Sequence, residues 1–133
     1  MKSAKATSGK LVEWEELVLF DINEIPKEGH VRANELASWW MEEAAKEVAN
    51  LVPKAINYGS VDLDIMGEAL LSLLPRLRGV VSGQELAIAF YLQGKISRLI
   101  GGYEQGVLPN RDTPEDIKIY AGMLLRVRET GTW

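Results

Sequence analysis

The sequence predicts an all-α protein, an antiparallel bundle of four to five helices behind a short N-terminal extension. Apolar residues recur at intervals of three and four along four segments, glycine and proline separate these segments, and strand-type alternation is nowhere sustained. Of the 133 residues, 47% are hydrophobic, which is enough for one core. We expect residues 1–29 to form a partly flexible extension and residues 30–133 to form a single helical domain.

The first predicted helix covers residues 30–57 and carries a regular apolar stripe of Leu36, Trp40, Ala44, Val48, Leu51 and Ala55. Pro53 lies inside it. Because proline lacks an N–H and clashes with the preceding turn, we expect a kink or a break near Leu51. Gly59 is suited to end this helix, and Ser60 is placed to cap a second helix over residues 61–74.

Capping patterns mark the starts of the last two helices. Ser82 and Glu85 form a capping box that opens the third helix. Thr113 is expected to cap the fourth helix, with Pro114 at its first position, and the helix is expected to end near Gly131. The short connections favour antiparallel packing of successive helices.

Composition excludes several classes of function. The 15 Lys and Arg residues are outnumbered by 19 Asp and Glu, so we expect no nucleic-acid partner. The absence of cysteine excludes a disulfide, a thiolate nucleophile and a zinc–thiolate site. No signal peptide or membrane-spanning apolar run is recognisable, which predicts a cytoplasmic protein without a membrane partner. There is also no glycine-rich phosphate loop and no dinucleotide fingerprint.

Two pairs of acidic residues are the strongest functional signal. Glu43 and Glu47 are four residues apart in the first helix, and Asp112 and Asp116 are four apart at the start of the last. Residues at this spacing share a helix face, and converging carboxylates are what a hard divalent cation such as Mg²⁺ needs. The alternative is structural: glutamates often border an apolar stripe, and Asp116 is spaced to complete a capping box with Thr113.

Acidic residues also open the second helix. Asp62 and Asp64 lie in its first turn, where the helix dipole favours a carboxylate without any ligand. The functional alternative is that the turn at Gly59 brings Asp62 towards Glu43 and Glu47.

Lysine, arginine and tyrosine side chains supply matching phosphate contacts. Lys95 and Arg98 project from one side of the third helix, and a guanidinium binds an oxyanion at two points. Lys54 is a third candidate, and Tyr58 and Tyr120 are placed to orient phosphates. The alternative is that the cations are solvated or form ion pairs with the acidic residues.

Three segments resemble small proteins of bacteriophages that infect actinobacteria: KAINYGSVDL at 54–63, FYLQGKISR at 90–98 and DTPEDIKIY at 112–120. Those proteins are similar, more distantly, to MazG-like all-α nucleotide pyrophosphohydrolases and to nucleotide-modification-associated domains. The resemblance covers about residues 30–133. It implies a helical core, a homo-oligomer (dimer or tetramer) and magnesium-dependent hydrolysis of a nucleoside triphosphate to the monophosphate and pyrophosphate.

The resemblance also implies a metal site, from which this sequence departs. The related families hold magnesium on an E-x-x-E motif and a later E-x-x-D motif. Here the spacings are Glu43-x-x-x-Glu47 and Asp112-x-x-x-Asp116, although Asp112-x-x-Glu115 also exists. We expect Glu43, Glu47 and Asp116 to be catalytic and to bind Mg²⁺ or Mn²⁺, with Asp112 in support.

Three hypotheses follow. The first is a magnesium-dependent nucleoside triphosphate pyrophosphohydrolase-like protein whose nucleotide substrate contacts Lys54, Tyr58, Lys95, Arg98 and Tyr120. The second is a non-catalytic phage accessory module that binds a nucleotide or a host protein, which the departures from E-x-x-E favour. The third is a purely structural oligomer with tryptophans at subunit contacts, namely Trp14, Trp39, Trp40 and Trp133.

Overall fold

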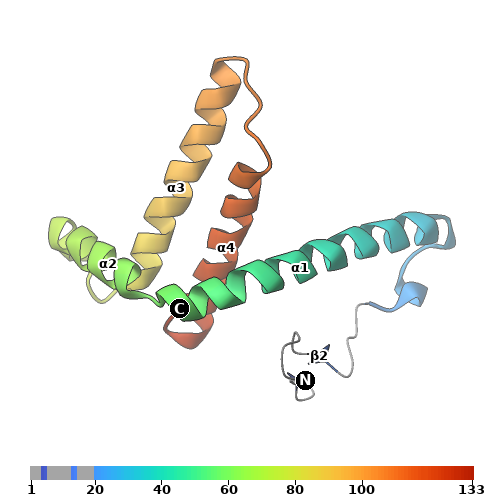
Figure 1. Ribbon diagram of the computed structural model, residues 1–133, viewed down its shortest axis with the longest axis horizontal. Coiled ribbons are helices and arrows are strands. Elements are labelled where there is room, and N and C mark those ends of the chain that lie inside the picture. The colour runs from blue at the N-terminus through green and yellow to red at the C-terminus, as the bar shows by residue number, and fades with distance from the viewer. Residues whose placement is uncertain (1–3, 6–12, 15–19) are drawn as a thin grey trace. The chain divides into compact units, whose positions relative to one another are not determined.

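The computed structural model describes residues 4–5, 13–14 and 20–133, and its main elements are helices. Four α-helices follow one another: α1 (His30–Tyr58), α2 (Val61–Leu73), α3 (Gly83–Glu104) and α4 (Asp112–Thr130) (Figure 1). There are three short 3-10 helices, η1 (Ile22–Glu24), η2 (Lys27–Gly29) and η3 (Pro75–Leu77). Two-residue strands β1 (Ala4–Lys5) and β2 (Glu13–Trp14), which the sequence did not predict, pair antiparallel. The predicted all-α class with four helices is confirmed.

The chain divides into two compact units, residues 1–54 and residues 55–133. The first contains β1, β2, η1, η2 and most of α1, and the second contains the last turn of α1 followed by α2, η3, α3 and α4. The expected loose tail over residues 1–10 lies largely outside the described residues. The single domain over residues 30–133 and the partly flexible extension stay predictions. None of the described helices combines the length and the apolarity needed to cross a membrane.

Helix α1 continues through Pro53, so the predicted alternative of a break near Leu51 is wrong, while the alternative of a kink there stays a prediction. Proline removes only the hydrogen bond that its own nitrogen would donate to Ala49. The other bonds continue to the end of the helix, where the Gly59 nitrogen donates to the Ala55 carbonyl at 2.9 Å. Gly59 has a φ of 64°, the left-handed conformation expected of a glycine that ends a helix.

The serine half of the predicted capping box is present in α3, whereas the predicted cap at the start of α4 is wrong. The Ser82 hydroxyl accepts from the Glu85 nitrogen at 3.1 Å, as predicted. Helix α4 begins at Asp112, so Thr113 is already helical and is not the cap. Arg111 precedes the helix with helical backbone angles and no side-chain cap, and its carbonyl accepts from the Glu115 nitrogen at 3.1 Å. Pro114 therefore lies inside the first turn, where its missing N–H has no helical partner to lose.

Two smaller differences concern helix ends. Ser60 precedes α2, but its side chain makes no capping hydrogen bond. Gly131 ends α4 as predicted, with a φ of 86°, and its nitrogen donates to the Val127 carbonyl at 2.7 Å.

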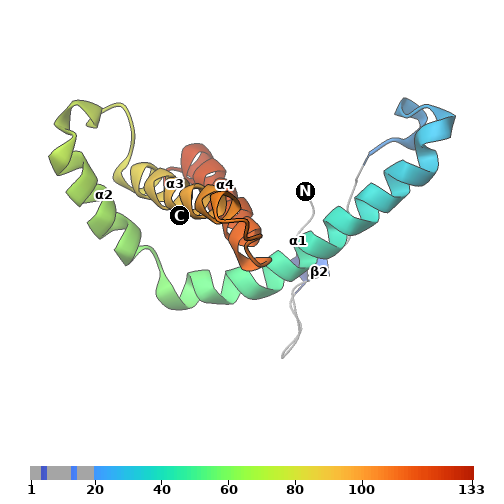
Figure 2. The same ribbon diagram turned by 90° about the horizontal axis from the view of Figure 1, so that it is seen from above.

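The core of the second unit lies along α3, which packs against both α2 and α4. Helices α3 and α4 run in opposite directions side by side in Figure 1 and stay adjacent in the turned view of Figure 2. The buried cluster consists of Leu63 from α2, Ala87 and Ile88 from α3, and Met123 and Val127 from α4. Ala87 and Ile88 are 0% exposed. Removing an isoleucine side chain from water stabilises a fold by about 1.5–3 kcal/mol, so Ile88 anchors the unit.

The contact between α2 and α3 depends on Gly67, which lies against the backbone of Gly83. A Cβ atom built on Gly67 would lie 2.2 Å from the carbonyl oxygen of Gly83, which is a severe overlap. Because the overlapping atom belongs to the backbone, no side-chain rotation relieves the clash. Glycine at residue 67 therefore permits the close approach of the two helices.

Polar contacts hold the ends of the helices together. The Gln84 amide donates to Asp64 at 2.8 Å, and its oxygen accepts from the Trp133 backbone nitrogen at 2.7 Å. Gln84 therefore connects α2, α3 and the segment after α4. The indole of Trp133 packs against the core cluster, and the Arg128 Nε donates to the Glu85 carboxylate at 2.7 Å.

An exposed ion pair closes the turn after α2. The Arg78 guanidinium donates to both carboxylate oxygens of Glu68, at 2.6 and 3.3 Å. These hydrogen bonds, together with the positive charge of Arg78, hold the pKa of the Glu68 carboxyl below its ordinary value. A carboxyl with a lowered pKa in the folded state contributes stability above its unfolded pKa, and the contribution is lost as the pH falls through the folded pKa.

We expect Gly67→Ala to destabilise the protein by about 1–3 kcal/mol or more, because the added methyl group overpacks a backbone contact. Urea denaturation followed by circular dichroism measures the change. Gly122→Ala in α4 is the control, since a Cβ there meets nothing within 4 Å. The control should be neutral or stabilising. Equal stability of Gly67→Ala and the wild type would contradict the close approach of α2 and α3.

Candidate functional site

A pocket of about 350 Å³ lies on the second unit between α3 and α4. Three of its side chains, Lys95, Arg98 and Tyr120, are residues that the sequence predicted as substrate contacts. The full lining is Phe90, Tyr91, Gln93, Gly94, Lys95, Arg98 and Tyr120. All but Tyr120 come from α3.

The spacing of residues on α3 explains why these side chains meet. Tyr91, Lys95 and Arg98 are separated by four and three residues, so they lie on one face of the helix. The same face carries Ile88 one turn earlier, and Ile88 is buried in the core. One face of α3 therefore contributes first to the core, through Ile88, and then to the pocket, where its side chains become polar.

Aromatic rings form one wall of the pocket. Tyr91 of α3 and Tyr120 of α4 stack with their ring centroids 5.9 Å apart and an angle of 27° between the planes. Phe90 meets Tyr91 edge to face, with centroids 6.0 Å apart. Both tyrosines also contact the core cluster, which fixes their position. The pocket thus has a rigid apolar wall, of the kind on which a planar ligand can stack.

The two cations of the pocket differ in their surroundings. The Lys95 ammonium is 2.9 Å from the Asp116 carboxylate, and the two side chains are 26% and 40% exposed. This contact confirms the alternative that Lys95 is an ion-pair partner of an acidic residue. Arg98 is exposed and, within residues 20–133, forms no ion pair. Its guanidinium is the group of the pocket whose charge is available to a ligand.

Gly94 leaves open space in this lining. A Cβ atom on Gly94 would meet nothing within 4 Å, so packing within the protein does not require a glycine here. Glycine inside a helix costs about 1 kcal/mol relative to alanine, which makes its presence unfavourable for α3 alone. Its effect is to keep the surface between Tyr91 and Arg98 free of a side chain.

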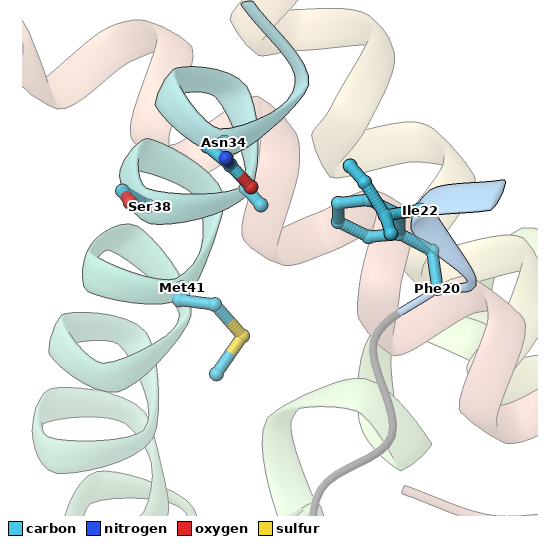
Figure 3. Close-up of a pocket in the computed structure, with 6 residues that line it drawn as sticks. Phe20, Ile22, Asn34, Ser38 and Met41 are labelled. Carbon is cyan, nitrogen blue, oxygen red and sulfur yellow. The ribbon is translucent and has the colours of Figure 1, made fainter. Parts of the chain in front are cut away.

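A larger hollow of about 610 Å³ lies on the first unit beside α1 (Figure 3). Its lining residues are uncharged: Phe20, Ile22, Asn34, Ala37, Ser38 and Met41. They offer two polar side chains and no acid, base or nucleophile other than the Ser38 hydroxyl. This hollow carries none of the residues that the sequence predicted for a site.

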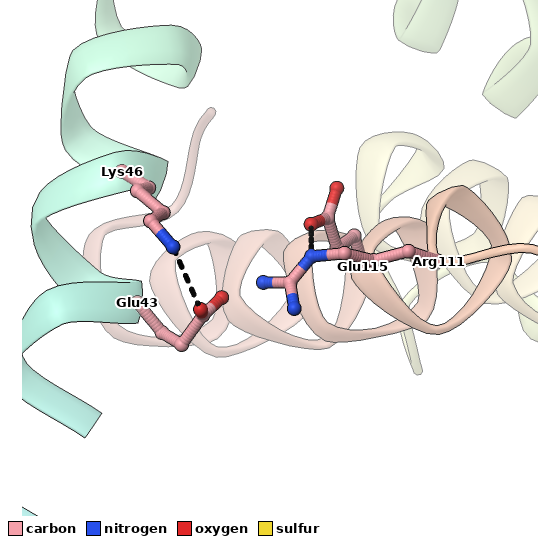
Figure 4. A network of polar contacts seen from close by, with 4 residues as sticks. All are labelled: Glu43, Lys46, Arg111 and Glu115. Atoms are coloured by element: carbon pink, nitrogen blue, oxygen red, sulfur yellow. Dashed lines mark hydrogen bonds and ion pairs between the residues drawn. The ribbon is translucent and has the colours of Figure 1, made fainter. Parts of the chain in front are cut away.

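The predicted acidic residues are divided between the units. Glu43 and Glu47 belong to the part of α1 in the first unit, and Asp112 and Asp116 belong to α4 in the second. Figure 4 shows an ion pair within α1, from the Lys46 ammonium to Glu43 at 3.3 Å. It also shows Arg111 bound to Glu115, the acid of the Asp112-x-x-Glu115 spacing.

Each unit by itself holds two of the four predicted metal ligands. Within neither unit do the described residues bring together three or more His, Cys, Asp or Glu side chains able to hold an ion. Asp116 and Glu115 each contact a cation of the chain, which competes with a metal for the same oxygens. Binding of Mg²⁺ or Mn²⁺ by Glu43, Glu47, Asp112 and Asp116 together stays a prediction, and so do the catalytic roles of Glu43, Glu47 and Asp116.

The remaining predicted residues lie outside this pocket or outside the second unit. Lys54 is the last residue of the first unit. Tyr58, at the end of α1, is 80% exposed and does not line the pocket. Asp64 accepts the hydrogen bond from Gln84 at 2.8 Å, which gives it a structural role. Substrate contact by Lys54 and Tyr58 stays a prediction.

The sequence analysis did not assign Phe90, Tyr91, Gln93 and Gly94 to a site. Tyr91 could have been found from its position one turn before Lys95 on the face shared with Arg98. Gly94 could have been found as an unexplained glycine inside a long helix. Phe90 and Gln93 offered no such signal, because their side chains suit an ordinary helix face.

The tryptophans bear on the structural-oligomer hypothesis. Trp133 packs against the core of its own unit, so its ring has a structural role there. Trp39 and Trp40 contact each other edge to face with ring centroids 5.1 Å apart. Their contact with another subunit, like the predicted dimer or tetramer, stays a prediction.

No protein-family model matches this chain, and neither a curated protein nor a solved structure matches it. We therefore infer function from the geometry of the pocket.

We expect Gly94→Ala to stabilise the protein by about 0.5–1 kcal/mol, because alanine favours the helix and its methyl group meets no protein atom. Gly101→Ala is the matched control on the same helix, where a Cβ also meets nothing within 4 Å. Thermal and urea denaturation should give the same direction for both variants. Destabilisation by Gly94→Ala alone would show that the open space next to this glycine is absent in solution.

Proposed function

We propose that this protein binds a nucleotide in the pocket between α3 and α4. The observation that carries the proposal is that one cavity is lined both by the stacked pair Tyr91 and Tyr120 and by Arg98, whose guanidinium forms no ion pair within residues 20–133. A nucleotide has the same two parts, a planar base and an anionic phosphate. Aromatic rings stack on bases, and a guanidinium donates two parallel hydrogen bonds to a phosphate.

The spacing of Tyr91 and Arg98 along α3 supports this match. Tyr91 and Arg98 are seven residues apart on α3, which corresponds to about 10 Å along the helix axis. This span is comparable with the distance between the base and the phosphate of a nucleotide. Gln93 supplies an amide, which offers both a donor and an acceptor to the edge of a base or to a ribose hydroxyl. Gly94 leaves room for the ligand to lie against the helix.

We expect Arg98→Gln to weaken nucleotide binding by about tenfold or more, since a hydrogen-bonded charge contributes about 1.5–3 kcal/mol. Isothermal titration calorimetry with adenosine and guanosine phosphates measures the affinity. Arg76→Gln is the control, because it removes the same charge from η3, away from the pocket. Gly94→Ala should also weaken binding, whereas Gly101→Ala should not. Absence of binding by the wild type, or equal losses from both arginine variants, would reject the proposal.

Magnesium-dependent pyrophosphohydrolase activity is the second candidate. The observation that favours it is that Lys95, Arg98 and Tyr120, all predicted to contact substrate, do line one cavity, with Asp116 paired to Lys95 beside it. The predicted metal ligands are divided between the two units, and neither unit alone presents a suitable set. This candidate therefore rests on the sequence resemblance and on the phosphate-binding part of the site.

If the protein hydrolyses nucleoside triphosphates, turnover should require Mg²⁺ or Mn²⁺ and should release pyrophosphate. Glu47→Gln and Asp116→Asn should then each lower kcat by at least about a hundredfold, because each removes a ligand charge from the metal. Chromatography of the products from a panel of nucleoside triphosphates measures the rates. Glu104→Gln, an exposed carboxylate at the end of α3, is the control. Nucleotide binding without turnover would leave the binding function alone.

A further inference from the structure

We infer that the pocket selects a nucleotide with a single phosphate group, and that Asp116 is the residue that sets this selectivity. The inference rests on the proposed nucleotide binding and adds the class of ligand. The observation behind it is that the two cations of the pocket differ in their pairing. Lys95 forms an ion pair with Asp116, whereas Arg98 forms no ion pair within residues 20–133 and can bind an anionic ligand.

The charges near the cavity determine which phosphate chain fits. Lys95 and Arg98 contribute two positive charges, and Asp116 returns one negative charge 2.9 Å from the Lys95 ammonium. A single phosphate group needs one two-point donor, which Arg98 provides. Each further phosphate adds negative charge that has no second available cation in the pocket and that the Asp116 carboxylate repels. A metal-free di- or triphosphate therefore gains little over a monophosphate.

The order of contacts along the helices places the phosphate at Arg98. Moving along α3 from Tyr91 to Arg98, the lining changes from aromatic to cationic, and Asp116 is one turn before Tyr120 on α4. A base stacked on the tyrosine pair directs its phosphate past Lys95 towards Arg98. Lys95 then lies beside the ligand but keeps its ion pair with Asp116.

The test compares adenosine mono-, di- and triphosphate in calorimetric titrations with EDTA present, so that no divalent cation contributes. Wild-type protein should bind the monophosphate at least as tightly as the triphosphate. Asp116→Asn frees Lys95 and removes the repulsion, so it should shift the ratio of affinities towards the triphosphate by about five- to tenfold. Asp62→Asn, which removes an exposed carboxylate from α2, should leave the ratio unchanged.

A double variant tests whether the ion pair as a whole contributes to monophosphate binding. Lys95→Met combined with Asp116→Asn removes both charges of the pair and leaves the net charge of the pocket unchanged, so it should keep monophosphate binding within about twofold of the wild type. Arg98→Gln should lose that binding. Circular dichroism and thermal denaturation confirm that each variant is folded.

Each outcome has a separate meaning. Failure of all three nucleotides to bind the wild type would reject the proposed function together with the inference. Binding of the metal-free triphosphate more than tenfold tighter than the monophosphate would overturn the inference and leave nucleotide binding intact. An unchanged ratio in Asp116→Asn, or a loss of monophosphate binding in the double variant of Lys95 and Asp116 equal to that in Arg98→Gln, would also overturn it.

Discussion

The structure of the second unit depends on the antiparallel seam between α3 and α4, and α2 packs against α3 as well. Ile88 shares the core with Met123, Tyr91 stacks on Tyr120, and Lys95 pairs with Asp116. Because the helices are antiparallel, each contact one turn further along α3 involves a residue one turn earlier in α4. The seam begins as a hydrophobic contact, continues as an aromatic one and ends as an ion pair. This gradient puts the cavity at its polar end, because side chains there no longer fill the space between the helices.

The hydrophobic end of the seam supplies the rigidity that the polar end lacks. An ion pair between partly exposed side chains contributes only about 0–1 kcal/mol, which is too little to fix two helices. Burial of Ile88 with its neighbours, and the close approach of Gly67 to Gly83, fix α3 between α2 and α4. A pocket supported by packed helices holds its geometry without a ligand, which lowers the entropic cost of binding. The packed core and the proposed nucleotide pocket therefore occupy successive turns of the same helix.

Much of the fold could be predicted from local sequence, whereas the site could be predicted only in part. Apolar periodicity located four helices, and Ser82 and Gly131 marked the start of α3 and the end of α4, because capping is a property of neighbouring residues. Pro53 does not break α1, since one missing hydrogen bond does not interrupt the helix. Thr113 was misread because Arg111 already has helical backbone angles.

The Lys95–Asp116 pair illustrates what the sequence could not provide. Both residues were recognised as chemically informative, but only the register of α3 against α4 shows that they contact each other. That register follows from packing across 21 residues of chain, which no local pattern specifies. The pair offsets the charge of Lys95, whereas Arg98 forms no ion pair within residues 20–133. Which cation of the pocket is offset in this way depends on which residues of α4 lie opposite α3, so it follows from the packing of the two helices and not from either helix alone.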